Sequence, residues 1–344
     1  MKKILLDENL NKYKANLHCH TNISDGEFTP EQIKELYKKH GYSVVAFTDH
    51  DIFLAHDDLN DDIFLALHGY EMEFYAPKAP GKTNKTCHIC LIQKDPKNMT
   101  QVCWNRQNGY FDGNGELYKD QAVFDETQPD FWREYTPEKV SQAIKIARDN
   151  GFFVTYNHPT WSVENFQDYM NFHGMHAMEI SNYSSAVDGF DEYNPRVYDD
   201  MLRGGKRIYC IGADDNHNYH SPDSPYSDSC GAYIVLFAKE LTYSSIMDSL
   251  FSGNFYSSQG IDNGPQIHSL YYEDGKVHIK CSPAVKVSVT GNSRRAFSKL
   301  MDKELITDAV LDIPPDNAYF RVTVVDEHGN HANSNAYFID EIEK

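Results

Sequence analysis

The chain has 344 residues, of which 40% are hydrophobic and 24% charged, and an excess of acidic over basic residues gives it a formal net charge of −19. This length accommodates one large α/β domain and a small second domain. The sequence has no apolar run of the roughly 18 residues that a membrane helix needs. It also lacks the Lys/Arg clusters with which proteins bind duplex nucleic acid or anionic lipid, so neither partner is expected. The apolar run after the basic tip is too short for a secretory leader, which predicts a cytoplasmic location.

Seven cysteines occur along the chain, and their odd number and irregular spacing disfavour a disulfide framework. Cys87 and Cys90 form a CxxC pair, which by itself could be a redox pair or half of a zinc site. The pair lies in the apolar run TCHICLI, and the sequence contains no second CxxC. We therefore interpret these two cysteines as core residues.

Two helices are predicted from their capping residues. Thr29 precedes a proline and stands three residues before Gln32, the pattern of an N-cap with a capping box, and Gly41 can end the helix that follows. The segment from Thr136 to Gly151 carries similar signals, with Thr followed by Pro at its start and Gly at its end. Apolar residues recur at helical spacing in both segments.

Short apolar runs follow each of these helices and recur along the N-terminal two-thirds of the chain, as expected for strands. Strands that alternate with helices indicate βα units and a parallel sheet. Seven or eight such units fit barrel-like closure, with an open doubly wound sheet as the alternative. The predicted strands are Ala15 to His18, Ser43 to Thr48, Ile63 to Leu67, Cys87 to Ile92, Phe152 to Tyr156, Ala177 to Ile180, Arg207 to Ile211 and Ala232 to Phe237.

Residues 95–135 interrupt this rhythm. The segment is rich in aromatic residues, Asn and Gly and shows no clear period. A loop of this length inside a compact domain is usually a lid, an inserted subdomain or a mobile segment. We expect an irregular insertion near the functional site that partly covers it.

After residue 264 the pattern changes to short strands without helices. Asp274-Gly275 and the Glu327–Asn330 segment are turn signals between such strands. We therefore predict two domains, a barrel over residues 1–264 and a small all-β, sandwich-like domain over residues 265–344. The strands expected in the second domain are Gln266 to Tyr272, Val277 to Cys281, Val285 to Val289, Tyr319 to Val325 and Ala336 to Ile339.

Histidines and acidic residues recur where the predicted strands give way to loops. His18 and His20 stand two residues apart at a strand end, so their side chains point to the same side and can hold one metal ion. Because the carboxyl ends of parallel strands share one face of a barrel, the other residues of this kind are expected to join them. These are Asp25, His50, Glu71, His88, His158, Asp215 and His217.

This set of nine side chains predicts a metal centre. Burying so many histidines and acids together is costly unless cations act as their partners. Nine ligands exceed the needs of one ion and suit two or three divalent ions. Histidine and carboxylate ligands accept Zn, Mn or Fe, so the identity of the metal stays open.

In order and spacing, these motifs resemble those of the polymerase-and-histidinol-phosphatase (PHP) family of metal-dependent phosphoesterases. The resemblance covers roughly residues 14–260 and implies a distorted (β/α)7 TIM-like barrel with a trinuclear site. The C-terminal run from Tyr319 to Asn335 also resembles the small β domain of the carbaryl-hydrolase-like branch of this family. The matching motifs are His18-x-His20, Thr48-Asp49-His50-Asp51, Gly69-Tyr70-Glu71, Asn157-His158-Pro159 and Asp215-x-His217.

The resemblance also implies a ligand set for each ion. Asp214 is an alternative to Asp215, and Glu73 is an alternative to Glu71. The implied sets are His18, His20, Glu71 and Asp215 for the first ion, Glu71, His88 and His158 for the second, and Asp25, His50 and His217 for the third.

Further residues are candidates for supporting roles. Asp49 either orients a ligand histidine or caps a helix. Arg133, in the irregular segment, is a candidate phosphate ligand, with a solvated surface role as the alternative. Glu71 is expected to bridge ions. His217 and His220 are candidate general acids, His217 as part of the last motif and His220 because it follows that motif closely.

The predicted function is metal-dependent hydrolysis of a small phosphomonoester or nucleotide, in which a metal-activated hydroxide attacks phosphorus. The β domain motivates an alternative, hydrolysis of a carbamate or ester at carbon by the same centre. A non-catalytic metal-binding module is the third possibility. It is disfavoured because every ligand position that the resemblance implies is filled.

Overall fold

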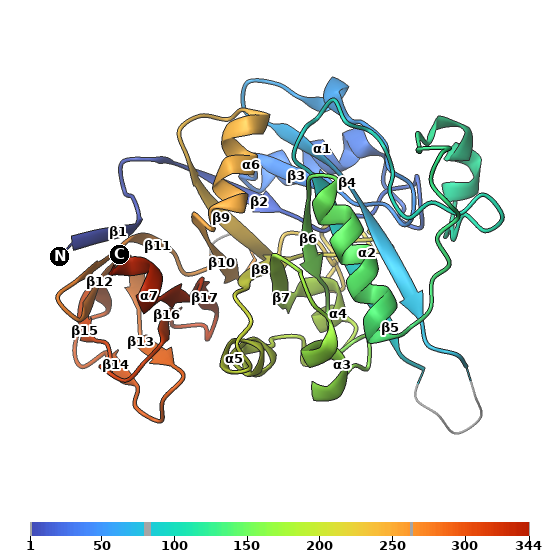
Figure 1. The fold of residues 1–344 in the computed structure, drawn as a ribbon. Helices are drawn as coiled ribbons and strands as arrows, with labels where there is room; N and C mark the ends of the chain where they lie inside the picture. Colours follow the sequence, from blue (N-terminus) through green and yellow to red (C-terminus); the bar gives the residue numbers. More distant parts are fainter. Residues whose placement is uncertain (1, 79–83, 262–263, 344) are drawn as a thin grey trace.

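The structure, a computed structural model, describes residues 2–78, 84–261 and 264–343, which form a mixed α/β fold with two sheets. Figure 1 shows the C-terminal strands gathered at one end of the molecule, where the first strand and both chain ends also lie. The rest of the chain builds a larger sheet with helices packed against it. None of the helices in the described ranges is long and apolar enough to cross a membrane.

Seven strands of the larger sheet follow one another in chain order. The first three and the last three pair in parallel, but the middle strand, β5, runs antiparallel to both of its neighbours. The sheet is therefore mixed rather than all parallel. The seven strands are β2 (Asn11–Asn16), β3 (Val44–Phe47), β4 (Leu65–Tyr75), β5 (Thr86–Gln93), β6 (Phe152–Tyr156), β7 (Ala177–Asn182) and β8 (Tyr209–Ala213).

The mixed α/β class is confirmed, but the predicted closed TIM-like barrel is wrong: within the described ranges the sheet does not close on itself. The physical reason is that β9 (Ala232–Ala238) pairs antiparallel with β2 and takes the edge that β8 would need. A further strand, β10 (Phe255–Gln259), then pairs with β9. The segments that follow β2 and β8 meet at an isolated bridge between Cys19 and Asn216.

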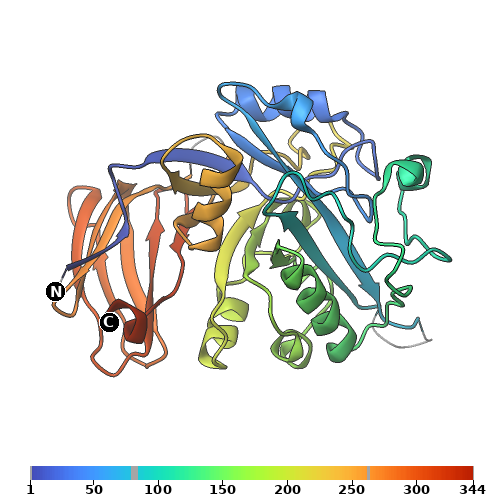
Figure 2. The same cartoon turned by 45° about the horizontal axis from the view of Figure 1, so that its top comes forward.

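The two helices predicted from their caps are both present. α1 (Pro30–Lys39) begins after Thr29, which forms a capping box with Gln32, and α2 (Pro137–Asp149) begins after Thr136. In Figure 2, α1 lies above the strands and α2 below them. The other helices are α3 (Phe166–Asn171), α4 (Tyr183–Val187), α5 (Pro195–Arg203), α6 (Tyr243–Phe251), α7 (Ile339–Ile342) and the 3-10 turns η1 (Asp57–Leu59) and η2 (Gly115–Gln121).

The region after residue 264 is dominated by strands, as predicted, and the Asp274-Gly275 hairpin turn joins β11 to β12. The sequence reading missed β14, β15 and β17. β1 (Lys2–Leu6) pairs with β11, and β17 pairs with β10, so both sheets run across the expected border, and the division at residues 264/265 stays a prediction. The strands are β11 (Ile267–Glu273), β12 (Lys276–Ala284), β13 (Lys286–Gly291), β14 (Phe297–Leu300), β15 (Ile306–Asp312), β16 (Tyr319–Val325), β17 (His331–Ser334) and β18 (Tyr337–Phe338).

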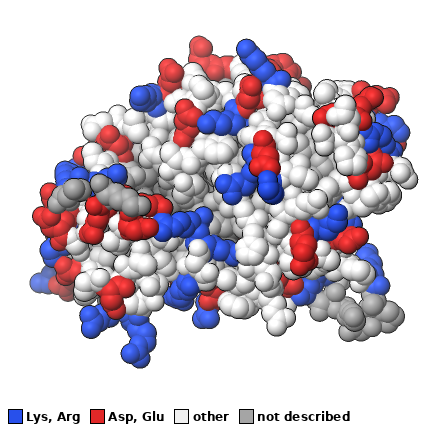
Figure 3. All heavy atoms as spheres, in the orientation of Figure 1, with Lys and Arg blue, Asp and Glu red and all other residues white. Residues whose placement is uncertain are grey.

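All seven cysteines are buried and free, which confirms the reading of Cys87 and Cys90 as core residues. Lys and Arg side chains on the face drawn in Figure 3 are interspersed with Asp and Glu, and no broad basic patch appears there.

A buried ion pair links the C-terminal strands to α5. Arg321 on β16 donates from Nε to Asp199 Oδ1 at 2.8 Å and from a terminal nitrogen to Asp199 Oδ2 at 3.2 Å. Both side chains are largely excluded from water. Such a pair is costly to break from one side, because the partner charge stays buried.

Replacing this arginine tests the link. We expect Arg321→Leu to lower the free energy of unfolding by about 2 kcal/mol or more, since Asp199 would lose its bidentate partner. The control is Lys145→Leu, which breaks a solvent-exposed pair with Asp149 on α2 and should leave the unfolding midpoint unchanged. Equal destabilisation of the two variants in denaturant unfolding would contradict this account of the link.

Candidate metal centre

The seven consecutive strands each place a polar side chain at one edge of the sheet. His18 and His20 follow β2, His50 follows β3, and His158 follows β6. Because β5 runs antiparallel, its contribution comes from its amino-terminal end, where His88 lies opposite Glu73 of β4. β4 also carries Glu71, β7 carries Glu179, and the segment after β8 carries Asp215 and His217.

Four of these side chains converge on a common point. His18 Nε2 lies 3.1 Å from His20 Nε2, 3.1 Å from Glu71 Oε1 and 3.1 Å from Asp215 Oδ1. His20 Nε2 lies 3.0 Å from Asp215 Oδ1 and 3.4 Å from Glu71 Oε2. Ligands about 2.0–2.1 Å from a tetrahedral zinc ion stand about 3.3 Å apart, so the spacing is that of a ligand set.

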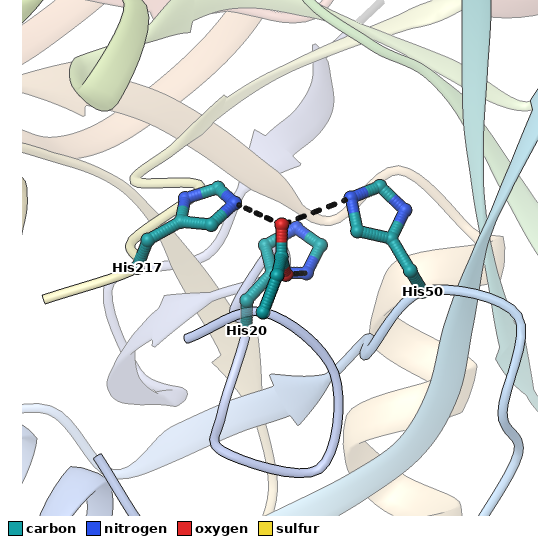
Figure 4. A group of neighbouring side chains, drawn as sticks. His20, His50 and His217 are labelled. Atoms are coloured by element: carbon teal, nitrogen blue, oxygen red, sulfur yellow. Dashed lines mark ion pairs between the residues drawn. The ribbon is translucent and has the colours of Figure 1, made fainter. Parts of the chain in front are cut away.

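A second group surrounds Asp25. Its Oδ2 lies 3.3 Å from His217 Nε2 and 3.8 Å from His50 Nε2, and its Oδ1 lies 3.5 Å from His20 Nδ1. Figure 4 shows the His50 and His217 rings on opposite sides of His20. Their ligand atoms fall within one ion-sized cluster.

The third group centres on the other side of Glu71. Its Oε1 lies 3.2 Å from His88 Nδ1 and 3.5 Å from His158 Nε2, while its Oε2 lies 3.5 Å from His50 Nδ1. The nine residues predicted as metal ligands are thus brought together. That they bind ions stays a prediction.

Two observations show that these residues fit divalent cations. Glu71 Oε2 and His50 Nδ1 are buried and lie 3.5 Å apart, yet neither forms a hydrogen bond within the described residues. Buried polar atoms are normally satisfied, and a cation would satisfy both. In addition, the ring nitrogens of His18 and His20 face each other and two carboxylates in a space that is closed to solvent.

Hydrogen bonds fix which nitrogen of several histidines faces the cluster. His217 Nδ1 lies 2.9 Å from the carbonyl oxygen of Asp215, which can only accept, so Nδ1 donates and Nε2 has the free lone pair. His18 Nδ1 lies 2.7 Å from Glu179 Oε1, which likewise directs Nε2 to the cluster. Carboxylates that orient ligand histidines in this way are typical of metal sites.

Glu179 was missed by the sequence reading. Besides contacting His18, its carboxylate accepts hydrogen bonds from the His158 backbone N–H and from Asn182 Nδ2, both at 2.9 Å. Asn157 was read as part of a motif without a role, and its Nδ2 donates to Glu71 Oε1 at 2.7 Å. The available signal for Glu179 was an acidic residue inside the otherwise apolar predicted strand.

The structure distinguishes between the alternative acids, Asp214 or Asp215 and Glu73 or Glu71, by where their carboxylates lie. Asp214 points away from the cluster and accepts hydrogen bonds from the backbone N–H groups of residues 230–232 and from Tyr37, so Asp215 faces the histidines. Burial raises the pKa of Asp214 to about 6. Glu73 lies 2.7 Å from His88 Nε2, on the side of that ring opposite Glu71.

Asp49 has neither of its two expected roles. Its carboxylate accepts hydrogen bonds from the backbone N–H groups of Thr21 and Ser24 and from both hydroxyls. It therefore fixes the loop that carries Asp25. Among the described residues no histidine donates a hydrogen bond to Asp49, and none of the described helices begins at it.

The irregular insertion contacts the centre through Arg133. Its guanidinium forms a buried, bidentate ion pair with Asp51, the neighbour of His50, and donates to the carbonyl oxygen of Glu73 at 3.0 Å. Gln101, also in the insertion, donates to the Asp51 carbonyl at 2.8 Å. The proposed phosphate-binding role of Arg133 is thus disfavoured, because its guanidinium is already paired.

Three non-glycine residues at the centre have positive φ angles: Asp51 (55°), His158 (23°) and Asp215 (56°). Such conformations cost about 1–3 kcal/mol each and persist where the surroundings hold them. The backbone N–H of Asp215 donates to the His18 carbonyl at 2.9 Å, which ties the segment after β8 to the segment after β2.

The cluster opens into a cavity of about 390 Å³. His220 lines its outer part, where its exposed ring lies 5.6 Å from that of Tyr226, away from the ligand groups. Trp161 packs edge-on against His88 and His158. The cavity is large enough for a small organic molecule beside the cluster.

No protein-family profile matches this chain, and no curated protein is detectably similar in sequence. Among solved structures, a two-domain protein from Bacteroides vulgatus that contains a predicted PHP-like metal-dependent phosphoesterase is similar over 97% of this chain and 96% of its own, with 15% identity and a TM-score of 0.43.

Two further solved structures are similar over part of this chain. A protein from Bifidobacterium adolescentis, whose function as a metal-dependent phosphoesterase is itself inferred, is similar over 61% of this chain and 90% of its own, with 17% identity and a TM-score of 0.38. An amidohydrolase from Chromobacterium violaceum, with bound sulfate and no metal, matches 62% and 93%, with 15% identity and a TM-score of 0.36.

The contact between Glu179 and His18 generates a testable expectation. Glu179→Gln should weaken binding of Zn²⁺ or Mn²⁺ by about 10- to 100-fold, because the histidine loses the carboxylate that orients its ring. Calorimetric titration of metal-free protein measures this. Glu164→Gln is the control, since Glu164 is also a carboxylate held by hydrogen bonds, but its partners are the Tyr135 and Tyr156 hydroxyls rather than a ligand histidine. Unchanged affinity in Glu179→Gln would refute the orienting role.

The Arg133 ion pair gives a second expectation. Arg133→Met should weaken the binding of at least one ion by about tenfold, because Asp51 and the adjacent His50 lose their support. Arg106→Met serves as the control, since Arg106 pairs with Asp130 on the exposed side of the same insertion. If both variants bind the same number of ions with the same affinity, the insertion does not support the centre.

Proposed function

We propose that this protein is a metal-dependent hydrolase whose preferred substrate is a small phosphomonoester or nucleotide. The observation that carries the proposal is the convergence of His18, His20, Glu71 and Asp215 at ligand spacing, with further histidines on both sides. Zn, Mn or Fe ions, two or three in number, would occupy the three groups. When bound, such ions polarise the bond to be cleaved and lower the pKa of a water molecule towards about 7.

The residues of the chain then have separate tasks. Glu71 lies between the groups and would bridge them as a ligand, which leaves it unsuited to act as a base. His217 is committed on both nitrogens, one to the Asp215 carbonyl and one to the Asp25 side, so it would serve as a ligand. We therefore assign proton donation to the leaving group to His220, which lines the same cavity.

The number of candidate metal ligands favours hydrolysis at phosphorus over hydrolysis at carbon. A phosphoryl group presents several oxygens, and ions held by adjacent ligand groups would bind and polarise them. Three neighbouring groups of ligands that share Glu71, His20 and His50 match that need.

One observation favours the alternative, a carbamate or ester bond at carbon. The residues that line the cavity include many carboxylates and, among those described, no Lys or Arg to bind an anionic substrate. A neutral carbamate or ester would not need such a residue. A non-catalytic metal-binding module receives no comparable support, because the cavity gives a substrate access to the ligand cluster.

Phosphate release from a panel of sugar phosphates and nucleotides tests the proposal. We expect chelation to abolish turnover, Mn²⁺, Zn²⁺ or Fe²⁺ to restore it, and the double variant His18→Ala/His50→Ala to lose at least about a hundredfold in kcat/KM. His278→Ala, in the β domain, is the control and should retain activity. If the fully metallated protein releases phosphate from no ester but cleaves aryl esters or carbamates, the alternative replaces the proposal.

A further inference from the structure

The wall of the cavity beyond the ligand cluster carries acidic and aromatic side chains. Asp112, from the irregular insertion, and Asp188, at the end of α4, line it and are exposed to solvent. Tyr75, Tyr219 and Tyr226 line the same outer part, and each is more than half exposed. Lys and Arg are absent from the described lining residues.

Other carboxylates of the wall are already compensated. Asp228 accepts hydrogen bonds from the backbone N–H groups of His217 and Asn218 at 2.7 and 3.0 Å. Glu73 Oε1 lies 2.7 Å from His88 Nε2. Asp112 and Asp188 are less compensated: Asp112 accepts a hydrogen bond from the backbone N–H of Gly113 at 2.7 Å, but neither carboxylate forms an ion pair within the described residues, and both are exposed on the wall.

The size of the cavity decides whether these two charges affect a ligand. A cavity of about 390 Å³ is roughly 9 Å across if spherical, which is about one Debye length at physiological salt. An anionic group inside it therefore lies within about one Debye length of both carboxylates, so salt weakens their repulsion but does not remove it. The ions of the proposed centre would offset one phosphoryl group at the inner end, and among the described lining residues no Lys or Arg, and outside the ligand cluster only the imidazole of His220, is available to offset a second.

We propose that Asp112 and Asp188 are specificity-determining residues that exclude substrates with a second anionic group. The substrate class is then a phosphomonoester whose alcohol part is uncharged or cationic, with the exposed tyrosines available to contact a ring. This inference rests on the proposed function for the reacting group, but the charge selection itself is measurable as binding.

The experiment compares adenosine 5′-monophosphate with adenosine 3′,5′-bisphosphate on the full-length, Mn²⁺-loaded protein. The readout is kcat/KM for a nucleotide that is hydrolysed and Kd for one that is not. We expect the monophosphate to be preferred by about tenfold. The variant Asp112→Asn/Asp188→Asn should reduce this preference by about threefold or more, and added salt should also reduce it.

The control is Asp302→Asn/Asp316→Asn, which makes the same change in net charge on exposed residues of the β domain and should leave the preference unchanged. Equal or better use of the bisphosphate, an unchanged preference in the cavity variant, or no binding of either nucleotide would overturn the inference. A binding preference that follows these expectations without turnover of either nucleotide would support the charge selection and exclude these two nucleotides as substrates, and the phosphate-release panel would then decide the phosphoesterase function.

Discussion

The structure depends on one buried carboxylate. Glu71 is almost fully shielded from solvent, and its two oxygens lie within 3.5 Å of nitrogens from five histidines. Five imidazoles around one acid cannot all be satisfied by protons, since each added positive charge repels the others at this distance. Divalent cations between the nitrogens and the oxygens would resolve this conflict. We therefore propose that these side chains are a ligand set.

The sheet is arranged to bring this ligand set together without closing into a barrel. β9 occupies the free edge of β2, so the strand series β2–β8 stays open along most of its length. Its two sides meet at the centre, where hydrogen bonds join residues 18 and 20 to residues 215 and 216. The candidate ligands from the first and last strands thus lie side by side.

Much of the centre could be predicted from the sequence because its signals are local. A histidine or acid that directly follows a strand is recognisable from a few neighbouring residues, as with His18, His50 and His158. Glu179 gave a weak signal, since its role comes from a contact with His18, 161 residues away in the sequence. The role of Arg133 was misread for the same reason, because its partner Asp51 is 82 residues distant.

In the fold, too, local features could be predicted from the sequence and long-range pairings could not. The caps of α1 and α2 are local patterns and were predicted correctly. The place of β9 on the edge of β2 and the antiparallel direction of β5 depend on pairing between distant segments, which local propensity does not specify. The β1 strand was missed because its partner, β11, lies more than 260 residues later in the chain.

The most direct test of the central claim is anomalous X-ray diffraction from crystals of the protein grown with Mn²⁺ or Zn²⁺. We expect two or three anomalous peaks inside the cluster, the strongest within about 2.0–2.3 Å of nitrogen or oxygen atoms of His18, His20, Glu71 and Asp215. Crystals that contain the metal elsewhere, with the cluster held together by ordered water alone, would contradict it.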